Sequence, residues 1–263
     1  MSLTTTLQVS LSQGVYTLTL DRPEQRNALD LPTLTALKAA LSEAHTRSDI
    51  RCVLIAATGA SFCAGADLKE WAEAQAQGRL ETYGWTQAAH ALMVQLQALN
   101  KPTLAVIQGS AVGAGLDLAL CCDLRLAGNS ARFRAGYTSM AYSPDAGGSW
   151  HLPRLVGPEQ TRRFLFLNEA WDAAQALRTG LVGEVVADDV LASRAQTMAL
   201  QLASGPTLAF AHTKTLLTSS ATRSLSQQLE AELLAGLACG RSHDADEALR
   251  AAAEKRTPLF TGR

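Results

Sequence analysis

Two short loops of small residues hold the backbone groups best suited to chemistry in this 263-residue sequence. The first runs from Ser61 to Glu70 and the second from Gly109 to Asp117, and each follows a predicted buried strand. Both also precede a predicted helix start, where backbone N–H groups can bind a negatively charged ligand. Two such donors converging on one oxygen atom would form an oxyanion hole. Close packing of a strand against a helix would equally account for each loop taken alone.

Two carboxylates lie in or after the second loop. Asp117 stands at the predicted start of a helix, where its charge would complement the positive end of the helix dipole. Asp145 follows Pro144 and precedes Ala146 and Gly147, an order that is typical of a tight turn. Each carboxylate therefore has a possible structural role beside a catalytic one.

The elements around these loops alternate between strand and helix. A helix capped by Asp30 places Leu34, Leu37 and Leu41 on one face, and further helices are predicted at Thr86–Leu99 and from Leu116 to Cys122. The predicted strands are Val15–Leu20, Cys52–Ala57, Thr103–Ile107, Leu124–Ala127 and Ala131–Ala135. This alternation predicts an α/β fold.

Helical patterns dominate the chain from Pro158 onward. A helix over Trp171–Thr179 ends at Gly180, and Leu181–Val186 is the last predicted strand. The remaining predicted helices are Leu191–Leu202, Pro206–Leu217, Leu225–Cys239 and Ala245–Lys255. Their apolar stripes are broad, so we expect them to pack on the main domain or on another subunit.

Composition excludes several classes of protein. The chain is 47% hydrophobic and 18% charged with a formal net charge of −1, which argues against a disordered protein and against a nucleic-acid-binding surface. No apolar run approaches the length of a membrane span, and the first ten residues lack the pattern of a secretory signal. The five cysteines form no CxxC pair and the five histidines do not cluster with possible ligands, so no metal site is predicted. We expect a cytoplasmic protein without membrane or nucleic-acid partners.

Taken together with their flanks, the two loops closely resemble the crotonase superfamily, the enoyl-CoA hydratase/isomerase family. The resemblance rests on FCAGADLKE, on KPTLAVIQGSAVGAGLDLALCCDLRLA and on SPDAGGSWHLPRLVG, in that order along the chain. Arg22-Pro23 with Arg26 to Leu29 resembles the family's N-terminal signature, and KRTPLFTGR resembles its C-terminal end.

The resemblance implies an architecture and a mode of assembly. The implied fold is an α/β spiral of strand–strand–helix turns over residues 1–190, which holds the acyl-CoA site, followed by a helical region over residues 191–263. That region would mediate trimerisation and close the coenzyme A site, giving a homotrimer or a hexamer made of two trimers. The substrate would be an acyl-CoA thioester, with coenzyme A as part of the substrate and no separate cofactor.

The resemblance also assigns binding residues. The backbone N–H groups of Ala66 and Ala114 would hold the thioester carbonyl, whose oxygen gains charge in the enolate intermediate. Coenzyme A and the substrate would contact Arg26, Ala28, Ala64, Ala66, Asp67, Leu68, Lys69 and Tyr137. Arg263 is a further basic candidate for the phosphates.

The reaction implied by the resemblance depends on which carboxylates are present. Family hydratases carry two glutamates, and their positions match Asp117 and Tyr137 here, so ordinary hydration is in doubt because a phenol of ordinary pKa is a poor base at neutral pH. Asp145 matches the catalytic carboxylate of several enoyl-CoA isomerases. The flanking segment resembles most closely the ring-epoxide isomerase branch, whose substrate is 1,2-epoxyphenylacetyl-CoA. We therefore expect isomerisation led by Asp145 and assisted by Asp117.

Three alternatives remain at the level of sequence. One is hydration of an enoyl-CoA. A second is hydrolytic dehalogenation of a haloaryl-CoA, in which Asp145 would attack the ring carbon and His90 would serve as base. The third is an acyl-CoA-binding member of the family that has lost catalysis.

Overall fold

A six-stranded sheet forms the centre of the molecule in the computed structural model, which describes residues 6–263. Its order is β1-β2-β3-β4-β6-β9, with β1 antiparallel to β2 and every other neighbouring pair parallel. The strands are β1 (Leu7–Ser12), β2 (Val15–Leu20), β3 (Cys52–Ala57), β4 (Thr103–Ile107), β6 (Leu124–Gly128) and β9 (Glu184–Val186). The short apolar runs of β3 and β4 are buried because helices cover both faces of the sheet.

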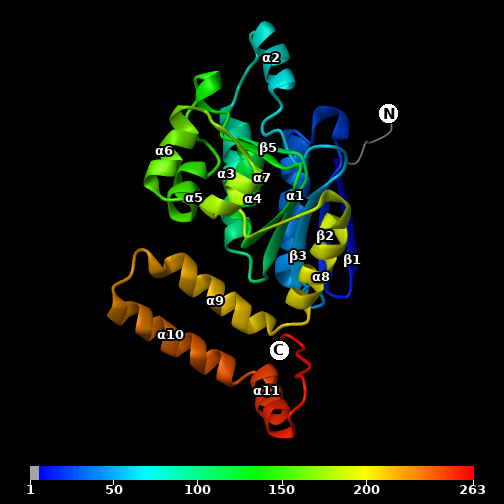
Figure 1. Cartoon of the computed structure of the whole chain (residues 1–263), viewed down its shortest axis with the longest axis vertical. Helices are drawn as coiled ribbons and strands as arrows, with labels where there is room; N and C mark the ends of the chain where they lie inside the picture. The colour runs from blue at the N-terminus through cyan, green and yellow to red at the C-terminus, as the bar shows by residue number, and fades with distance from the viewer. Residues whose placement is uncertain (1–5) are drawn as a thin grey trace.

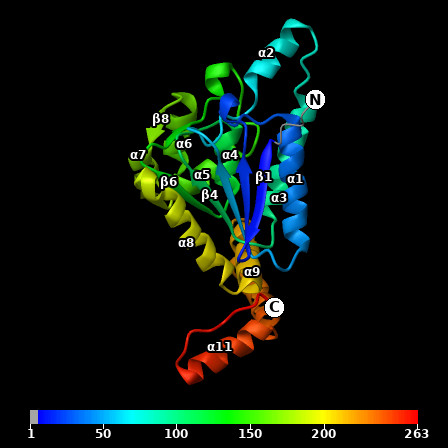
Figure 2. The ribbon, with the colours of Figure 1, turned by 90° about the vertical axis from the view of Figure 1, so that its right-hand side faces the viewer.

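Helices on the two faces of the sheet bury separate cores. One face packs against α1 (Leu31–Thr46), α3 (Tyr83–Gln97) and α4 (Ala114–Cys121) in the larger core, and the other packs against α8 (Leu191–Ala203). The turned view in Figure 2 places α8 across the sheet from α1 and α3. Four small or apolar residues of α8, spaced four apart from Leu191 to Ala203, pack on this second face. The first helix after residue 190 is therefore packed against the sheet.

A small second sheet adjoins the first. It joins β5 (Ser110–Val112), β7 (Arg132–Arg134) and β8 (Ala170–Asp172), with β5 parallel to β7 and β7 antiparallel to β8. Near it lie α5 (Gly148–Leu155), α6 (Pro158–Phe166) and α7 (Ala173–Thr179), while α2 (Leu68–Ala76) stands apart at the upper end in Figure 1. Short 3-10 turns lie at Pro23–Gln25, Thr138–Met140 and Asp188–Val190.

Three helices leave the body of the molecule as an extension, which we call the C-terminal arm: α9 (Thr207–Ser220), α10 (Leu225–Gly240) and α11 (His243–Glu254). Figure 1 shows the arm projecting from the end opposite α2. Along α10 a stripe of leucines at every fourth position, namely Leu225, Leu229, Leu233 and Leu237, is between 50% and 75% exposed. An apolar stripe of this kind is typical of a helix that packs against a partner.

Arg51 connects the base of the arm to the residues beyond α11. Its guanidinium donates to the Thr207 hydroxyl at 3.0 Å, to the Phe260 carbonyl at 2.7 Å and to the Gly205 carbonyl. Asp244 at the start of α11 accepts from the backbone N–H groups of Thr261 and Gly262 at 2.7 and 2.8 Å. One arginine from the end of the first strand–helix unit thus joins two segments that lie more than 150 residues further along the chain.

The structure differs from the sequence-based elements at several points. β1 was missed, because an edge strand that stays largely exposed carries little apolar signal. The helix expected over Trp171–Thr179 begins at Ala173, since Trp171 belongs to β8 and Asp172 caps α7 by accepting from the Gln175 N–H. The strand expected over Leu181–Val186 is limited to its last three residues. Residues 1–5, half of the segment searched for a secretory signal, lie outside the described residues.

None of the helices found between residues 6 and 263 is both long and apolar enough to cross a membrane.

Candidate active site

The two small-residue loops lie against each other and are joined by backbone hydrogen bonds. The N–H of Cys63 donates to the Ser110 carbonyl, and the N–H of Val112 donates to the Cys63 carbonyl, both at 3.0 Å. Gly65 adopts a φ of +89°, and a Cβ at this position would lie 2.8 Å from the Val112 carbonyl oxygen. Glycine is therefore required at position 65 both by its backbone conformation and by the closeness of the second loop.

Two backbone donors meet where the loops touch. Ala66 follows Gly65, and Ala114 is the first residue of α4, whose opening N–H groups have no acceptor within the helix. Neither N–H of this pair donates to a protein acceptor among residues 6–263. A Cβ at Gly65 would lie 3.3 Å from the Ala114 nitrogen, so the two loops bring these donors close together at one cavity. The arrangement has the features of the predicted oxyanion hole.

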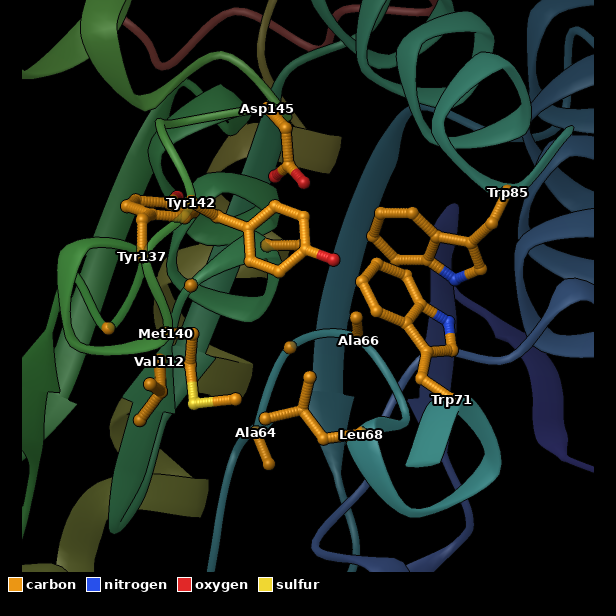
Figure 3. Close-up of a pocket in the computed structure, with 14 residues that line it drawn as sticks. Ala64, Ala66, Leu68, Trp71, Trp85, Val112, Tyr137, Met140, Tyr142 and Asp145 are labelled. Carbon is orange, nitrogen blue, oxygen red and sulfur yellow. The ribbon is translucent and has the colours of Figure 1, made fainter. Parts of the chain in front are cut away.

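The cavity in front of these donors is lined by small and apolar residues together with four aromatic side chains, and it encloses about 480 Å³ including its open mouth. The indoles of Trp71 and Trp85 meet edge to face, with ring centroids 5.3 Å apart and planes at 88°. The Trp85 Nε1–H donates to the Leu29 carbonyl at 2.8 Å, which fixes that ring. Tyr142 stands 6.1 Å from Trp71, centroid to centroid. Figure 3 shows the two indoles on one side of the cavity.

Sequence reasoning missed this aromatic lining. Trp71 lies among charged residues of α2, and Trp85 lies in a helix whose apolar face reads as ordinary core. Met140 and Tyr142 come from the irregular segment between β7 and α5. The one available signal was the presence of two of the four tryptophans of the chain within fifteen residues of the first loop.

Asp145 is placed at the cavity by the turn that follows Pro144. Its carboxylate points into the cavity in Figure 3, on the same wall as the tyrosines. Burial raises the pKa of this carboxyl above its ordinary value, although a nearby backbone hydrogen bond and the His90 side chain act in the opposite direction. His90 itself is exposed and does not line the cavity. Its Nε2–H donates to the backbone carbonyl of Asp145 at 2.7 Å rather than to the carboxylate.

Asp117 is close to the cavity without reaching it. The side chain is fully buried and lies behind Tyr137, whose hydroxyl donates a hydrogen bond to the Asp117 Oδ2. The other carboxylate oxygen, Oδ1, has no partner among residues 6–263, and a Cβ at Gly148 would lie 2.6 Å from it. Burial raises the pKa of Asp117 to about 7, and burial together with the neighbouring Asp117 raises the pKa of Tyr137 well above its ordinary value.

A groove beside the cavity collects seven of the eight residues that were expected to contact coenzyme A and the substrate, and the eighth, Tyr137, lines the cavity instead. The groove is lined by Arg26, Ala28, Ala64, Ala66, Asp67, Leu68 and Lys69. It shares Ala64, Ala66 and Leu68 with the cavity, so a ligand can run from one into the other. Arg26 and Lys69 are exposed and make no ion pair within residues 6–263, whereas Arg22, which sequence reasoning did not select, pairs with Asp67 at 2.9 Å.

Arg263 is not brought to this groove by its own chain. Its carbonyl accepts a hydrogen bond from the N–H of Asp244 at 2.9 Å, which holds it beside α11. Figure 1 shows the C-terminus near the base of the arm, well away from α2.

Comparison with known proteins gives a family and several relatives. Residues 10–263 match the enoyl-CoA hydratase/isomerase family. The chain is 34% identical to the 1,2-epoxyphenylacetyl-CoA isomerase of Escherichia coli, over 96% of this chain and 97% of that protein. It is 37% identical to the 2,3-dehydroadipyl-CoA hydratase of the same organism, over 98% and 99% respectively. A solved structure of a Pseudomonas aeruginosa protein is 59% identical and covers 89% of this chain and 99% of its own, with a TM-score of 0.84.

Proposed function

This chain belongs to the enoyl-CoA hydratase/isomerase family, and we propose that within it the protein isomerises an enoyl-CoA thioester with Asp145 as the proton carrier. The observation that carries the proposal is the position of the Asp145 carboxylate on the wall of the cavity that also receives the Ala66 and Ala114 donors. A base and an oxyanion site that face one cavity are the two parts that enolate chemistry requires.

The proposed reaction moves one proton. The thioester carbonyl accepts hydrogen bonds from the N–H groups of Ala66 and Ala114, so the charge that develops on its oxygen is stabilised as a C–H bond breaks. Asp145 takes that proton from one carbon and returns it to another, and the double bond shifts between them. Burial supports this role, because it raises the pKa of Asp145 and makes the carboxylate a stronger base. The steps use no electron carrier and no metal, and coenzyme A enters as part of the substrate.

The lining of the cavity supports an apolar acyl group. Fourteen residues line it, and among these described residues none is basic, so a second carboxylate on the acyl chain would lack a partner. The two indoles and Tyr142 offer ring faces and edges suited to an unsaturated or cyclic acyl group. The relative that isomerises 1,2-epoxyphenylacetyl-CoA supports the same choice.

The geometry at His90 supports isomerisation over hydrolytic dehalogenation. A dehalogenase of the expected type needs a histidine free to activate water at an ester formed on Asp145. Here His90 lies outside the lining of the cavity, and its Nε2–H is used by the Asp145 backbone carbonyl.

Hydration is the second candidate. The hydratase relative favours it, as does the placement of Asp117 and Tyr137 at the positions that match the two glutamates of family hydratases. The buried position of Asp117 weighs against direct contact with water in the cavity.

A panel of unsaturated acyl-CoAs, with products resolved by liquid chromatography and mass spectrometry, separates these functions. Isomerisation changes retention at constant mass, hydration adds the mass of one water, and dehalogenation of a haloaryl-CoA releases halide. We expect the first result. Binding of the thioesters without turnover would assign the protein to the non-catalytic members of the family.

A further inference from the structure

The Asp117 side chain is a costly feature that the proposed role of Asp145 does not account for. It is a fully buried carboxyl without a cationic partner, and one of its oxygens has no hydrogen-bond partner among residues 6–263. Such a group destabilises the fold when ionised. Its eight-residue helix α4 is otherwise apolar and entirely buried, so an apolar side chain would fit the surroundings better. A carboxyl kept under these conditions points to a role in chemistry.

Among the described residues, Tyr137 is the one whose side chain forms a hydrogen bond with Asp117. Tyr137 lines the cavity, and it is 6% exposed, whereas Asp117 is shielded from the cavity. The Tyr137 hydroxyl donates its proton to Oδ2 of Asp117, which leaves the lone pairs of the hydroxyl oxygen available on the side away from Asp117. A phenol in this position has a proton acceptor behind it.

We propose that the Tyr137 hydroxyl is the second proton-transfer group of the cavity and that it exchanges protons with Asp117 behind it. The inference rests on the proposed function and refines it: Asp145 takes a proton from one carbon, and Tyr137 rather than Asp145 delivers a proton to the other carbon. Proton exchange with water then restores both groups for the next turnover. In one direction, the Tyr137 oxygen accepts a proton from the substrate as its own O–H bond breaks, and a new O–H bond forms on Asp117. In the reverse direction, Asp117 returns that proton to the tyrosine oxygen while the hydroxyl proton passes to the substrate carbon.

This pair avoids the difficulty of an isolated tyrosine base. The tyrosine never has to become a stable phenolate, because it gains and loses a proton in the same step. Asp117 is suited to hold the proton, since its pKa of about 7 lies near neutral pH. Tyr137 is suited to remain neutral, because burial and the carboxylates of Asp117 and Asp145 all raise its pKa. Asp145 also raises the pKa of Asp117, so the two carboxyls of the site influence each other.

Gly148 supports the arrangement sterically. A Cβ there would lie 2.6 Å from Asp117 Oδ1 and 3.3 Å from the Tyr137 hydroxyl oxygen, so α5 can approach the pair only with glycine at its first position. The approach excludes side chains and bulk water from the space around the shared proton.

The first test uses turnover of 3-hexenoyl-CoA by the full-length protein. Tyr137→Phe removes the hydroxyl and retains the ring, and Asp117→Asn retains an acceptor for the tyrosine but cannot take its proton. We expect each change to lower kcat on the order of 100-fold, and the double variant to be no worse than either one. Tyr83→Phe serves as the matched control, because it also removes one tyrosine hydroxyl, but from a side chain that is 68% exposed and lies outside the cavity. Asp117→Asn with more than half of wild-type kcat would overturn the relay, because a carboxyl that only positions Tyr137 is replaced well by an amide.

The second test does not depend on turnover. Infrared difference spectra between pH 5 and pH 9 should contain the C=O band of a protonated carboxylic acid that is lost on ionisation near neutral pH. The band should be absent in Asp117→Asn and should titrate at a different pH in Tyr137→Phe. A wild-type spectrum without a carboxyl titrating near neutral pH would overturn the relay even if isomerisation is found. If the panel of thioesters fails but this titration is present, the proposed substrate reaction is wrong and the proton-sharing pair stands.

Discussion

The Nε2–H of His90 on α3 donates a hydrogen bond to the backbone carbonyl of Asp145 at 2.7 Å. This bond ties the turn that carries the cavity carboxylate to a helix of the main core. It also determines which nitrogen of His90 carries a proton, because a carbonyl oxygen can only accept. The histidine therefore supports the backbone of Asp145, and its ring lies outside the cavity lining.

We predict that His90→Gln is mild. Glutamine can also donate to the Asp145 carbonyl, so kcat should fall by less than about tenfold. Intact-protein mass spectrometry after incubation with a haloaryl-CoA checks the alternative. A stable adduct on His90→Gln, located at Asp145, would show that the residue hydrolyses an ester and would establish the dehalogenase mechanism.

Asp145→Asn should abolish turnover and leave binding nearly intact. Asparagine is almost isosteric but cannot accept and return a proton, so we expect kcat to fall on the order of 100-fold or more while KM changes little. Steady-state kinetics with the substrate found in the thioester panel, combined with calorimetric binding of that thioester, measures both effects. Near-normal kcat in this variant would move the proton-transfer role away from Asp145.

Ala66→Pro removes one of the two backbone donors outright. Proline has no N–H, and losing a single oxyanion donor typically costs on the order of 100- to 1000-fold in kcat. Ala66→Ser keeps the N–H with a small side chain, so it should lose far less. Circular dichroism establishes that both variants fold. A folded Ala66→Pro variant with wild-type turnover would contradict the oxyanion assignment.

Asp117 should make the fold less stable as the pH rises. In the unfolded chain this carboxyl ionises at its ordinary pKa of 3.8, whereas in the folded protein the proton is held until about pH 7. Between these values the folded state binds a proton that the unfolded state has lost, so stability falls with rising pH and the full penalty is present above pH 7. Asp117→Asn should therefore be more stable than wild type at pH 8, by about 1–3 kcal/mol.

Urea unfolding at pH 8 and at pH 4 measures that difference in the free energy of unfolding. The gain from Asp117→Asn should shrink at pH 4, where the wild-type carboxyl is largely neutral in the folded state and about half protonated in the unfolded chain. An equal loss of stability at both pH values would mean that the amide disturbs packing and that ionisation of Asp117 costs little.

We predict that the protein is a trimer or a pair of trimers held by the C-terminal arm. Light scattering should give three or six times the chain mass of 27.9 kDa. The leucine stripe of α10 is exposed in one chain, and burying each such side chain is worth about 1.5–3 kcal/mol. Leu229→Asp combined with Leu233→Asp should dissociate the assembly, whereas Val9→Asp on the exposed face of β1 should not. A stable wild-type monomer at micromolar concentration would refute the prediction.

The parts of the site that depend on backbone could be predicted from the sequence. The loops around Ala66 and Ala114 are recognisable because glycine and alanine gather after a buried strand in both, a pattern that leaves backbone N–H groups accessible to a ligand. The structure brings them into contact through Gly65, and it gathers the expected coenzyme A residues other than Tyr137 in one groove. These features follow from local chain geometry, which small residues specify directly.

Side-chain environment was less accessible to sequence reasoning. Asp117 reads as a helix-start carboxylate, and only the packing of α5 and Tyr137 around it reveals that it is buried. The aromatic cavity is built from α2, α3 and the segment before α5, which meet only after the chain folds. His90 entered the sequence argument as a base acting beside Asp145, whereas in the structure it contacts the Asp145 backbone, a distinction that depends on the tertiary position of the turn.

Because Arg51 bonds to a residue close to the C-terminus, one contact at the base of the arm can form only late in synthesis of the chain. Phe260, whose carbonyl Arg51 holds, is synthesised after the sheet and after every helix of the arm. A growing chain can therefore complete the sheet and the cavity before the hydrogen bond between Arg51 and the Phe260 carbonyl forms at the base of the arm. Chains interrupted before Phe260 would therefore have a formed cavity in the body of the molecule and an arm that is held less firmly at its base.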